Sequence, residues 1–205
     1  MTPQAPPGNG QSDREFANGW KVLLAGMLGV TCGASPIPFN LIGFTVAPLT
    51  AEFGWSRTEI ILPATIYGLI ASLMAPVFGW LADRHGVRKV ALWSVFAFAL
   101  ALAAVALTPT ANKTSTLYFY YGLWTVIGLV GIGSTPVTWS RAVNLWFFRH
   151  RGLALGILLM GTSVAALVIP KLAVWAIAEF GWRMMFALMA LLPLLVALPV
   201  AWLYF

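Results

Sequence analysis

The sequence predicts an all-α membrane protein built from six transmembrane helices, and two observations carry this prediction. Of its 205 residues, 60% are hydrophobic and only 9% are charged, which is far from the composition of a water-soluble domain. The charged residues also leave six long uncharged stretches. Each stretch comes near or exceeds the roughly 20 helical residues that cross a bilayer core of about 30 Å. Helices are expected rather than strands, because no alternating barrel pattern is present.

The spans follow from the uncharged stretches in chain order. Residues 1–19 come first; they are polar and rich in Pro, Gly, Asn and Gln, so we expect a disordered cytoplasmic tail. Residues 20–205 then form the six-span bundle. The predicted spans cover about residues 20–50, 59–82, 90–109, 117–146, 152–177 and 184–204.

Basic residues are divided unequally between the predicted loops. With the tail in the cytoplasm, seven lie inside and three lie outside, which the positive-inside rule favours. Six crossings then place both termini in the cytoplasm, and the membrane of a bacterium would be its inner membrane. The net charge of +6 therefore reflects topology, and no nucleic-acid partner is expected. The inside residues are Arg14, Lys21, Arg84, Arg88, Lys89, Arg149 and Arg151, and the outside residues are Arg57, Lys113 and Arg183.

The loop between the second and third predicted spans carries the most specific motif. Residues 79–89 read GWLADRHGVRK. An ordinary positive-inside loop explains the basic residues but not an aspartate between two glycines. The segment resembles the signature loop of the major facilitator superfamily at every defined position. The residues that carry the resemblance are Gly79, Asp83, Arg84, Gly86, Arg88 and Lys89.

Other segments resemble the branch of that superfamily containing monocarboxylate carriers and oxalate/formate exchangers, among them residues 52–57, 151–156 and 181–183. The resemblance runs from about Trp20 to the end of the sequence and covers the N-terminal half of a twelve-span fold. It implies two three-helix inverted repeats in this chain. In the family, the aspartate of the signature loop bridges to the other half, so Asp83 would control access if a second half in cis, or a second copy of the chain, is present.

The resemblance implies secondary active transport of a small organic solute by alternating access, with this chain as half of the transporter. We favour an organic anion such as a carboxylate. No enzymatic activity, cofactor or metal is expected: Cys32 is the one cysteine, and His85 and His150 lie in loops away from any nucleophile. The alternative is a truncated or orphan half that transports nothing alone and acts at most as a membrane assembly subunit.

Glycine and proline interrupt the first predicted span midway. Gly33, Pro36 and Pro38 form the predicted helix break, because Pro38 cannot donate to the carbonyl of the residue four positions earlier. Asn40 shares a helical face with Gly33 and Pro36, and it is the preferred polar contact for a solute. The alternative is a packing kink in which Asn40 bonds to a neighbouring helix.

Three polar residues share one face of the fourth predicted span, namely Ser134, Thr138 and Arg141. A cation there could hold a carboxylate, and our hypothesis is that Asn40 and Arg141 face a shared cavity. Arg141 could equally lie at the cytoplasmic edge and extend its head group to water. For Lys171 in the fifth span, an outer-leaflet position of the same kind is favoured.

Overall fold

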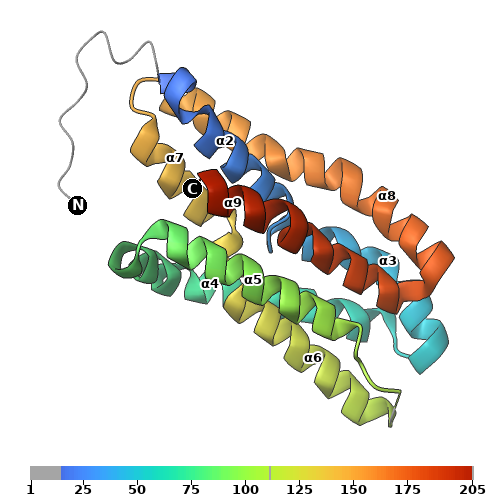
Figure 1. Ribbon diagram of the computed structural model, residues 1–205. Coiled ribbons are helices and arrows are strands. Elements are labelled where there is room, and N and C mark those ends of the chain that lie inside the picture. Colours follow the sequence, from blue (N-terminus) through green and yellow to red (C-terminus); the bar gives the residue numbers. More distant parts are fainter. Residues whose placement is uncertain (1–14, 111, 205) are drawn as a thin grey trace.

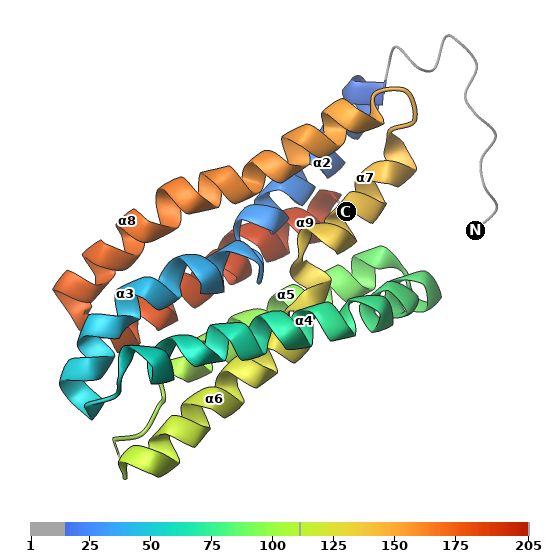
Figure 2. The ribbon, with the colours of Figure 1, turned by 180° about the vertical axis from the view of Figure 1, so that it is seen from behind.

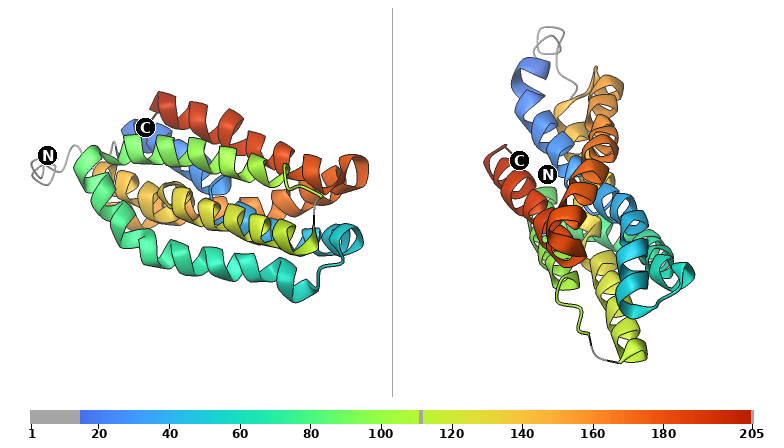
Figure 3. Two further views of the ribbon diagram at one scale, coloured as in Figure 1. Left: turned by 90° about the horizontal axis from the view of Figure 1, so that it is seen from below. Right: turned by 90° about the vertical axis from the view of Figure 1, so that its right-hand side faces the viewer.

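The computed structural model describes residues 15–110 and 112–204, and these form helices joined by short connections (Figure 1). The predicted all-α class is confirmed for this part of the chain. The long helices run roughly side by side (Figure 3). In chain order the elements are α2 (Glu15–Thr31), α3 (Pro36–Phe53), α4 (Arg57–His85), α5 (Val87–Val105), α6 (Lys113–Val130), η1 (Ile132–Ser134), α7 (Pro136–Trp146), α8 (Arg151–Leu192), η2 (Pro193–Ala197) and α9 (Leu198–Tyr204).

Within the described residues, four helical segments are long and apolar enough to cross a membrane: Gly19–Phe53, Arg57–His85, Val87–Val105 and Arg151–Tyr204. The predicted fourth span is absent from this set, and η1 divides it into α6 and α7. The predicted fifth and sixth spans are one segment, but its backbone bends at Gly181, where φ is 81° and ψ is 170°. Figures 1 and 2 show the ribbon reversing its direction within α8 and returning along the bundle. Six crossings remain a prediction.

Helix α2 begins at Glu15, which lies inside the segment predicted as a tail. The Glu15 carboxylate accepts hydrogen bonds from the backbone N–H groups of Phe148, Arg149 and His150 at 3.0–3.1 Å. These contacts attach the start of α2 to the loop between α7 and α8. The rest of the predicted tail, residues 1–14, lies outside the described residues.

Small residues allow α2 to pack closely against two other helices. A Cβ atom added at Gly29 would lie 2.3 Å from the Trp139 ring on α7. One added at Gly161 of α8 would lie 2.5 Å from the carbonyl oxygen of Met27. Close backbone approach at small residues is the usual way in which membrane helices pack, because burying apolar surface gains little in lipid. The packing of α2 against α7 and α8 therefore depends on the absence of side chains at these two glycines.

Candidate functional site

The first helix break lies between α2 and α3, at residues 32–35. Gly33 lies within it, and Pro36 and Pro38 occupy the first turn of α3, where their missing N–H groups cost no helical hydrogen bond. The Tyr67 hydroxyl of α4 donates to the Ala34 carbonyl, and the Ala34 N–H donates to the Ser134 hydroxyl at 3.0 Å. Side chains from two other elements therefore satisfy the backbone groups that the break frees.

A second break lies between α6 and α7, where the short η1 turn replaces α-helix. Ser94 of α5 donates to the Val130 carbonyl at 2.6 Å and accepts from the Gly133 N–H at 3.1 Å. A Cβ atom added at Gly131 would lie 2.5 Å from the Cβ of Ala34. The two broken helices therefore cross at their breaks, with backbone close to backbone.

The predicted cavity residues of the fourth span belong to this crossing rather than to an open surface. Ser134 is fully buried; besides accepting from Ala34, it donates to the Gly131 carbonyl at 2.7 Å. Thr138 is 4% exposed. Both side chains are enclosed by the bundle, and their place on a solute cavity remains a prediction.

Arg141 binds the 79–89 loop. Its guanidinium donates to the Asp83 carboxylate at 2.6 Å and to the Gly79 carbonyl at 3.0 Å. A Cβ atom added at Gly79 would lie 2.9 Å from the Arg141 guanidinium, so glycine at this position makes room for the arginine. Asn40 has a different partner, since its amide donates to the Pro36 carbonyl of its own helix at 2.7 Å. Asn40 and Arg141 therefore have different partners, and their shared cavity remains a prediction.

The other residues of the 79–89 loop shape the turn between α4 and α5. Gly86 has a φ of 91°, a backbone conformation that favours glycine. Arg88 donates to the Trp202 carbonyl of α9 at 2.6 Å, and Arg84 lies over the Trp80 ring with its guanidinium carbon 5.2 Å from the centroid. No hydrogen bond or ion pair joins Lys89 to another described residue.

Lys171 was not among the residues predicted to bind a solute, although the structure places it beside a hollow. It lies exposed on α8 beside Phe44 of α3, and both residues line a hollow of about 480 Å³ together with Pro170, Val174 and Trp175. Among the described residues, no acidic side chain pairs with it. Asn40 is one helical turn from Phe44, about 6 Å along α3, and is half-buried. The open surface of Phe44, Lys171 and Val174 is called the α3–α8 face below, and helical spacing adds Asn40 to it.

A dense cluster of contacts occupies the opposite end of the bundle from Asp83. The Glu52 carboxylate accepts from Arg183 at 2.7 Å and from the Trp182 indole N–H at 2.6 Å. Arg183 also donates to the Thr108 carbonyl at 3.2 Å, and its guanidinium carbon lies 4.3 Å from the centroid of the Trp182 ring. These residues, the Glu52 cluster, join α3, the end of α5 and the bend of α8.

Comparison with known proteins decides the family. The model for the Major Facilitator Superfamily matches residues 28–205, which is most of the chain. The chain belongs to the major facilitator superfamily. The resemblance at the 79–89 loop is thereby confirmed at the level of the superfamily, whose members are membrane transporters rather than enzymes. The monocarboxylate and oxalate/formate branch remains a prediction.

Individual relatives in this superfamily are distant. The chain is 26% identical to the cis,cis-muconate transport protein of Acinetobacter baylyi, over 95% of this chain and 47% of that protein. It is 27% identical to the hexuronate transporter of Escherichia coli, over 91% of this chain and 41% of that protein. A multidrug resistance protein B homolog of Mycobacterium tuberculosis is also 27% identical, over 91% of this chain and 34% of that protein. The chain thus spans less than half the length of these relatives.

Proposed function

We propose that the chain forms the N-terminal half of a secondary transporter that carries a small organic anion by alternating access. The α3–α8 face is one wall of its solute cavity, and the Lys171 ammonium binds a carboxylate of the solute. A second half, in cis or as a second copy of the chain, supplies the opposite wall. The observation that carries this proposal is an exposed lysine with no counterion among the described residues.

The depth of Lys171 is the first supporting argument. It lies ten positions before the bend at Gly181, or about 15 Å along the helix. Trp182 and Arg183 follow that bend, and such residues are typical of the membrane interface. A bilayer core of about 30 Å then puts Lys171 near its middle. An ammonium group in lipid at that depth is costly, so such residues face a water-filled cavity or a counterion.

The neighbourhood of Lys171 suits an organic anion. Phe44 and Trp175 give the hollow an apolar wall, and the Lys171 ammonium gives it one positive charge. Asn40 adds an amide that keeps an N–H and a carbonyl oxygen for other partners after its bond to Pro36. The helix break is next to Asn40, as is common at transporter binding sites. An apolar wall with a few polar groups is the usual composition of a small-molecule site.

The relatives support an anion as the solute class. Two of them are named for muconate and hexuronate, and both of these compounds carry carboxylate groups. Arg141 is a weaker candidate for carboxylate binding because Asp83 already holds it. We assign the Asp83–Arg141 pair to control of access at the cytoplasmic end, with both termini on that side of the membrane. Asp83 is 70% exposed and so keeps acceptor sites for the second half.

Uptake by proteoliposomes tests the proposal. The chain is reconstituted with its second half, and uptake of labelled muconate and hexuronate is measured at equal protein content. Lys171→Gln is expected to reduce uptake at least tenfold, because removing one charge-assisted bond is worth about 1.5–3 kcal/mol. Lys171→Arg keeps the charge and should retain measurable uptake.

Lys113→Gln is the matched control, since it removes a lysine that donates to the Gly54 carbonyl at 2.8 Å, far along the chain from Lys171. It should leave uptake near the wild-type value. Unchanged uptake in Lys171→Gln would refute the role of Lys171. Uptake of neutral solutes but of neither anion would refute the anion class.

A further inference from the structure

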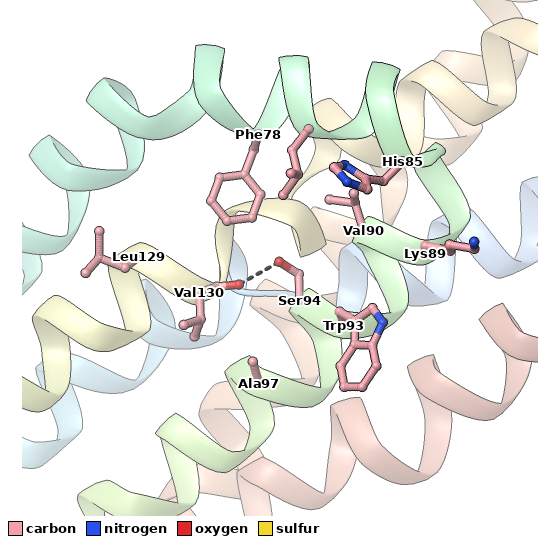
Figure 4. Close-up of a pocket in the computed structure, with 10 residues that line it drawn as sticks. Phe78, His85, Lys89, Val90, Trp93, Ser94, Ala97, Leu129 and Val130 are labelled. Carbon is pink, nitrogen blue, oxygen red and sulfur yellow. Dashed lines mark hydrogen bonds between the residues drawn. The ribbon is translucent and has the colours of Figure 1, made fainter.

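An apolar trough of about 410 Å³ runs between α4, α5 and α6, on residues that the transport proposal does not use (Figure 4). Its walls are mostly carbon. Ser94 lines the trough, but its hydroxyl is already bonded to the Val130 carbonyl at 2.6 Å. The apolar lining residues are Phe78, Leu81, Trp93, Ala97, Leu129 and Val130.

Two nitrogen-bearing side chains lie at the end of this trough where α4 meets α5. His85 is the last residue of α4, and Lys89 is in the first turn of α5 (Figure 4). Both are exposed, and among the described residues neither has a hydrogen-bond or ion-pair partner. Lys89 belongs to the 79–89 loop, yet it lines this trough and not the hollow beside the Asp83–Arg141 pair. A cation thus stands at the mouth of a pocket that offers only apolar surface beneath it.

The dimensions fit one leaflet of a bilayer. From Lys89 to Ala97 the trough follows α5 for about 12 Å. A leaflet contributes about 15 Å of hydrocarbon, so the trough stays within it. Trp93 lies between the two and is 71% exposed, as expected for an indole at the level of the lipid head groups.

We propose that the trough is a binding site for an anionic phospholipid. The phosphate of the lipid lies on the Lys89 ammonium and the His85 imidazole, and one acyl chain fills the trough as far as Ala97. Charge complementarity selects this occupant, because a basic mouth on an apolar pocket matches an anionic head group on an acyl chain. A helix from another polypeptide would need an acidic residue at the same level as its apolar face.

Native mass spectrometry of the purified full chain tests this site. Phosphatidylglycerol or phosphatidylcholine is added to the chain in detergent. The detergent is then removed in the mass spectrometer, and the number of lipids bound per chain is counted. One phosphatidylglycerol should bind in preference. Lys89→Gln should weaken it about fivefold, the effect expected from one basic residue near a lipid surface. Ala97→Trp fills the trough without changing charge and should also lower occupancy.

The matched control is Arg84→Gln, which removes the same charge from the same loop outside the trough. It should leave phosphatidylglycerol binding within twofold of wild type. Glycerol 3-phosphate, which has the head-group phosphate but no acyl chain, should not bind. The proposal is overturned if Arg84→Gln and Lys89→Gln weaken binding equally, if phosphatidylcholine binds as well as phosphatidylglycerol, or if glycerol 3-phosphate competes. The proposal is also overturned if bound lipid falls as the fraction of dimer rises, because a second copy of the chain would then occupy the trough.

Discussion

The Glu52 cluster and the Asp83–Arg141 pair lie at opposite ends of the bundle. They differ in how many donors the carboxylate has and in how exposed it is. Glu52 accepts from both Trp182 and Arg183, and its side chain is 30% exposed. Among the described residues Asp83 accepts from Arg141 alone, and its side chain is 70% exposed. A carboxylate with several donors favours one fixed arrangement, whereas one with a single donor can accept from a new partner at little cost. From this comparison we predict that the bundle keeps its contacts at the Glu52 end and exchanges them at the Asp83 end.

The largest effect on stability is expected from Arg183→Ala. This change removes the ion pair with Glu52, the bond to the Thr108 carbonyl and the stacking over Trp182. We expect the free energy of unfolding to fall by roughly 2 kcal/mol, after allowing for the partial exposure of the pair. Unfolding of the purified chain in mixed micelles, followed by circular dichroism, measures it. Arg57→Ala at the same end removes a solvent-exposed arginine and is the control; equal losses in the two variants would contradict a special role for the cluster.

Glu15 tests whether the number of donors to a carboxylate, or its place in the bundle, decides how much that carboxylate adds to stability. It is a carboxylate with three backbone donors and is 7% exposed, yet it contacts the loop between α7 and α8 rather than the Glu52 cluster. Glu15→Gln should lower the free energy of unfolding by about 1–2 kcal/mol, because backbone N–H groups lose a charged acceptor. If the free energy of unfolding fell by less than about 0.3 kcal/mol, the place of the carboxylate in the bundle would matter more than its number of donors.

The same contacts predict a dependence on pH. Burial acts to raise the pKa of the Glu15 carboxyl, but hydrogen bonds from the Arg149, His150 and Phe148 backbones outweigh it, so the pKa is lowered. A lowered pKa in the folded state adds stability that is fully present above the unfolded pKa and is lost as the pH falls through the folded pKa. The difference between wild type and Glu15→Gln should therefore shrink as the pH falls below about 4. A difference that grows below that pH would have the wrong sign.

The smallest effect on stability is expected from Asp83→Asn. An ion pair that is largely exposed is worth about 0–1 kcal/mol, so the unfolding transition should move little. Transport by the complete protein should nevertheless change, because the variant loses the charge that we assign to control of access. The same unfolding assay and the uptake assay measure the two quantities. A large loss of stability with normal uptake would reverse the comparison between the two ends.

The helical class and the first break could be predicted because local chemistry decides them. Uncharged stretches require helices in lipid, and Gly33 with Pro36 ends one helix and starts another. The partner of Arg141 could not be predicted in this way, since Asp83 is 58 positions away and only the fold brings the two side chains together. Periodicity places Arg141 on a face but not against a neighbour.

The helical start at Glu15 and the open position of Lys171 were missed for the same reason. Glu15 is held by backbone donors from residues 148–150, which a reading of the surrounding polar sequence does not reveal. A signal for Lys171 was present, because a lysine inside a long apolar stretch is rare. Its neighbours Phe44 and Val174 are distant in sequence from each other, so only the fold gathers them into one face.

The most direct test of the central claim asks whether the α3–α8 face meets water and solute. In a Cys32→Ala background, Val174→Cys and Leu100→Cys are labelled with a water-soluble maleimide in the membrane-embedded complete protein. Both native side chains are 52% exposed, but Val174 lies beside Lys171 and Leu100 lies on α5. We predict that Cys at position 174 is labelled, that muconate or hexuronate protects it, and that Lys171→Gln abolishes this protection, while position 100 stays unreactive. Equal reactivity at the two positions, or no protection by either anion, would contradict an anion cavity on this face.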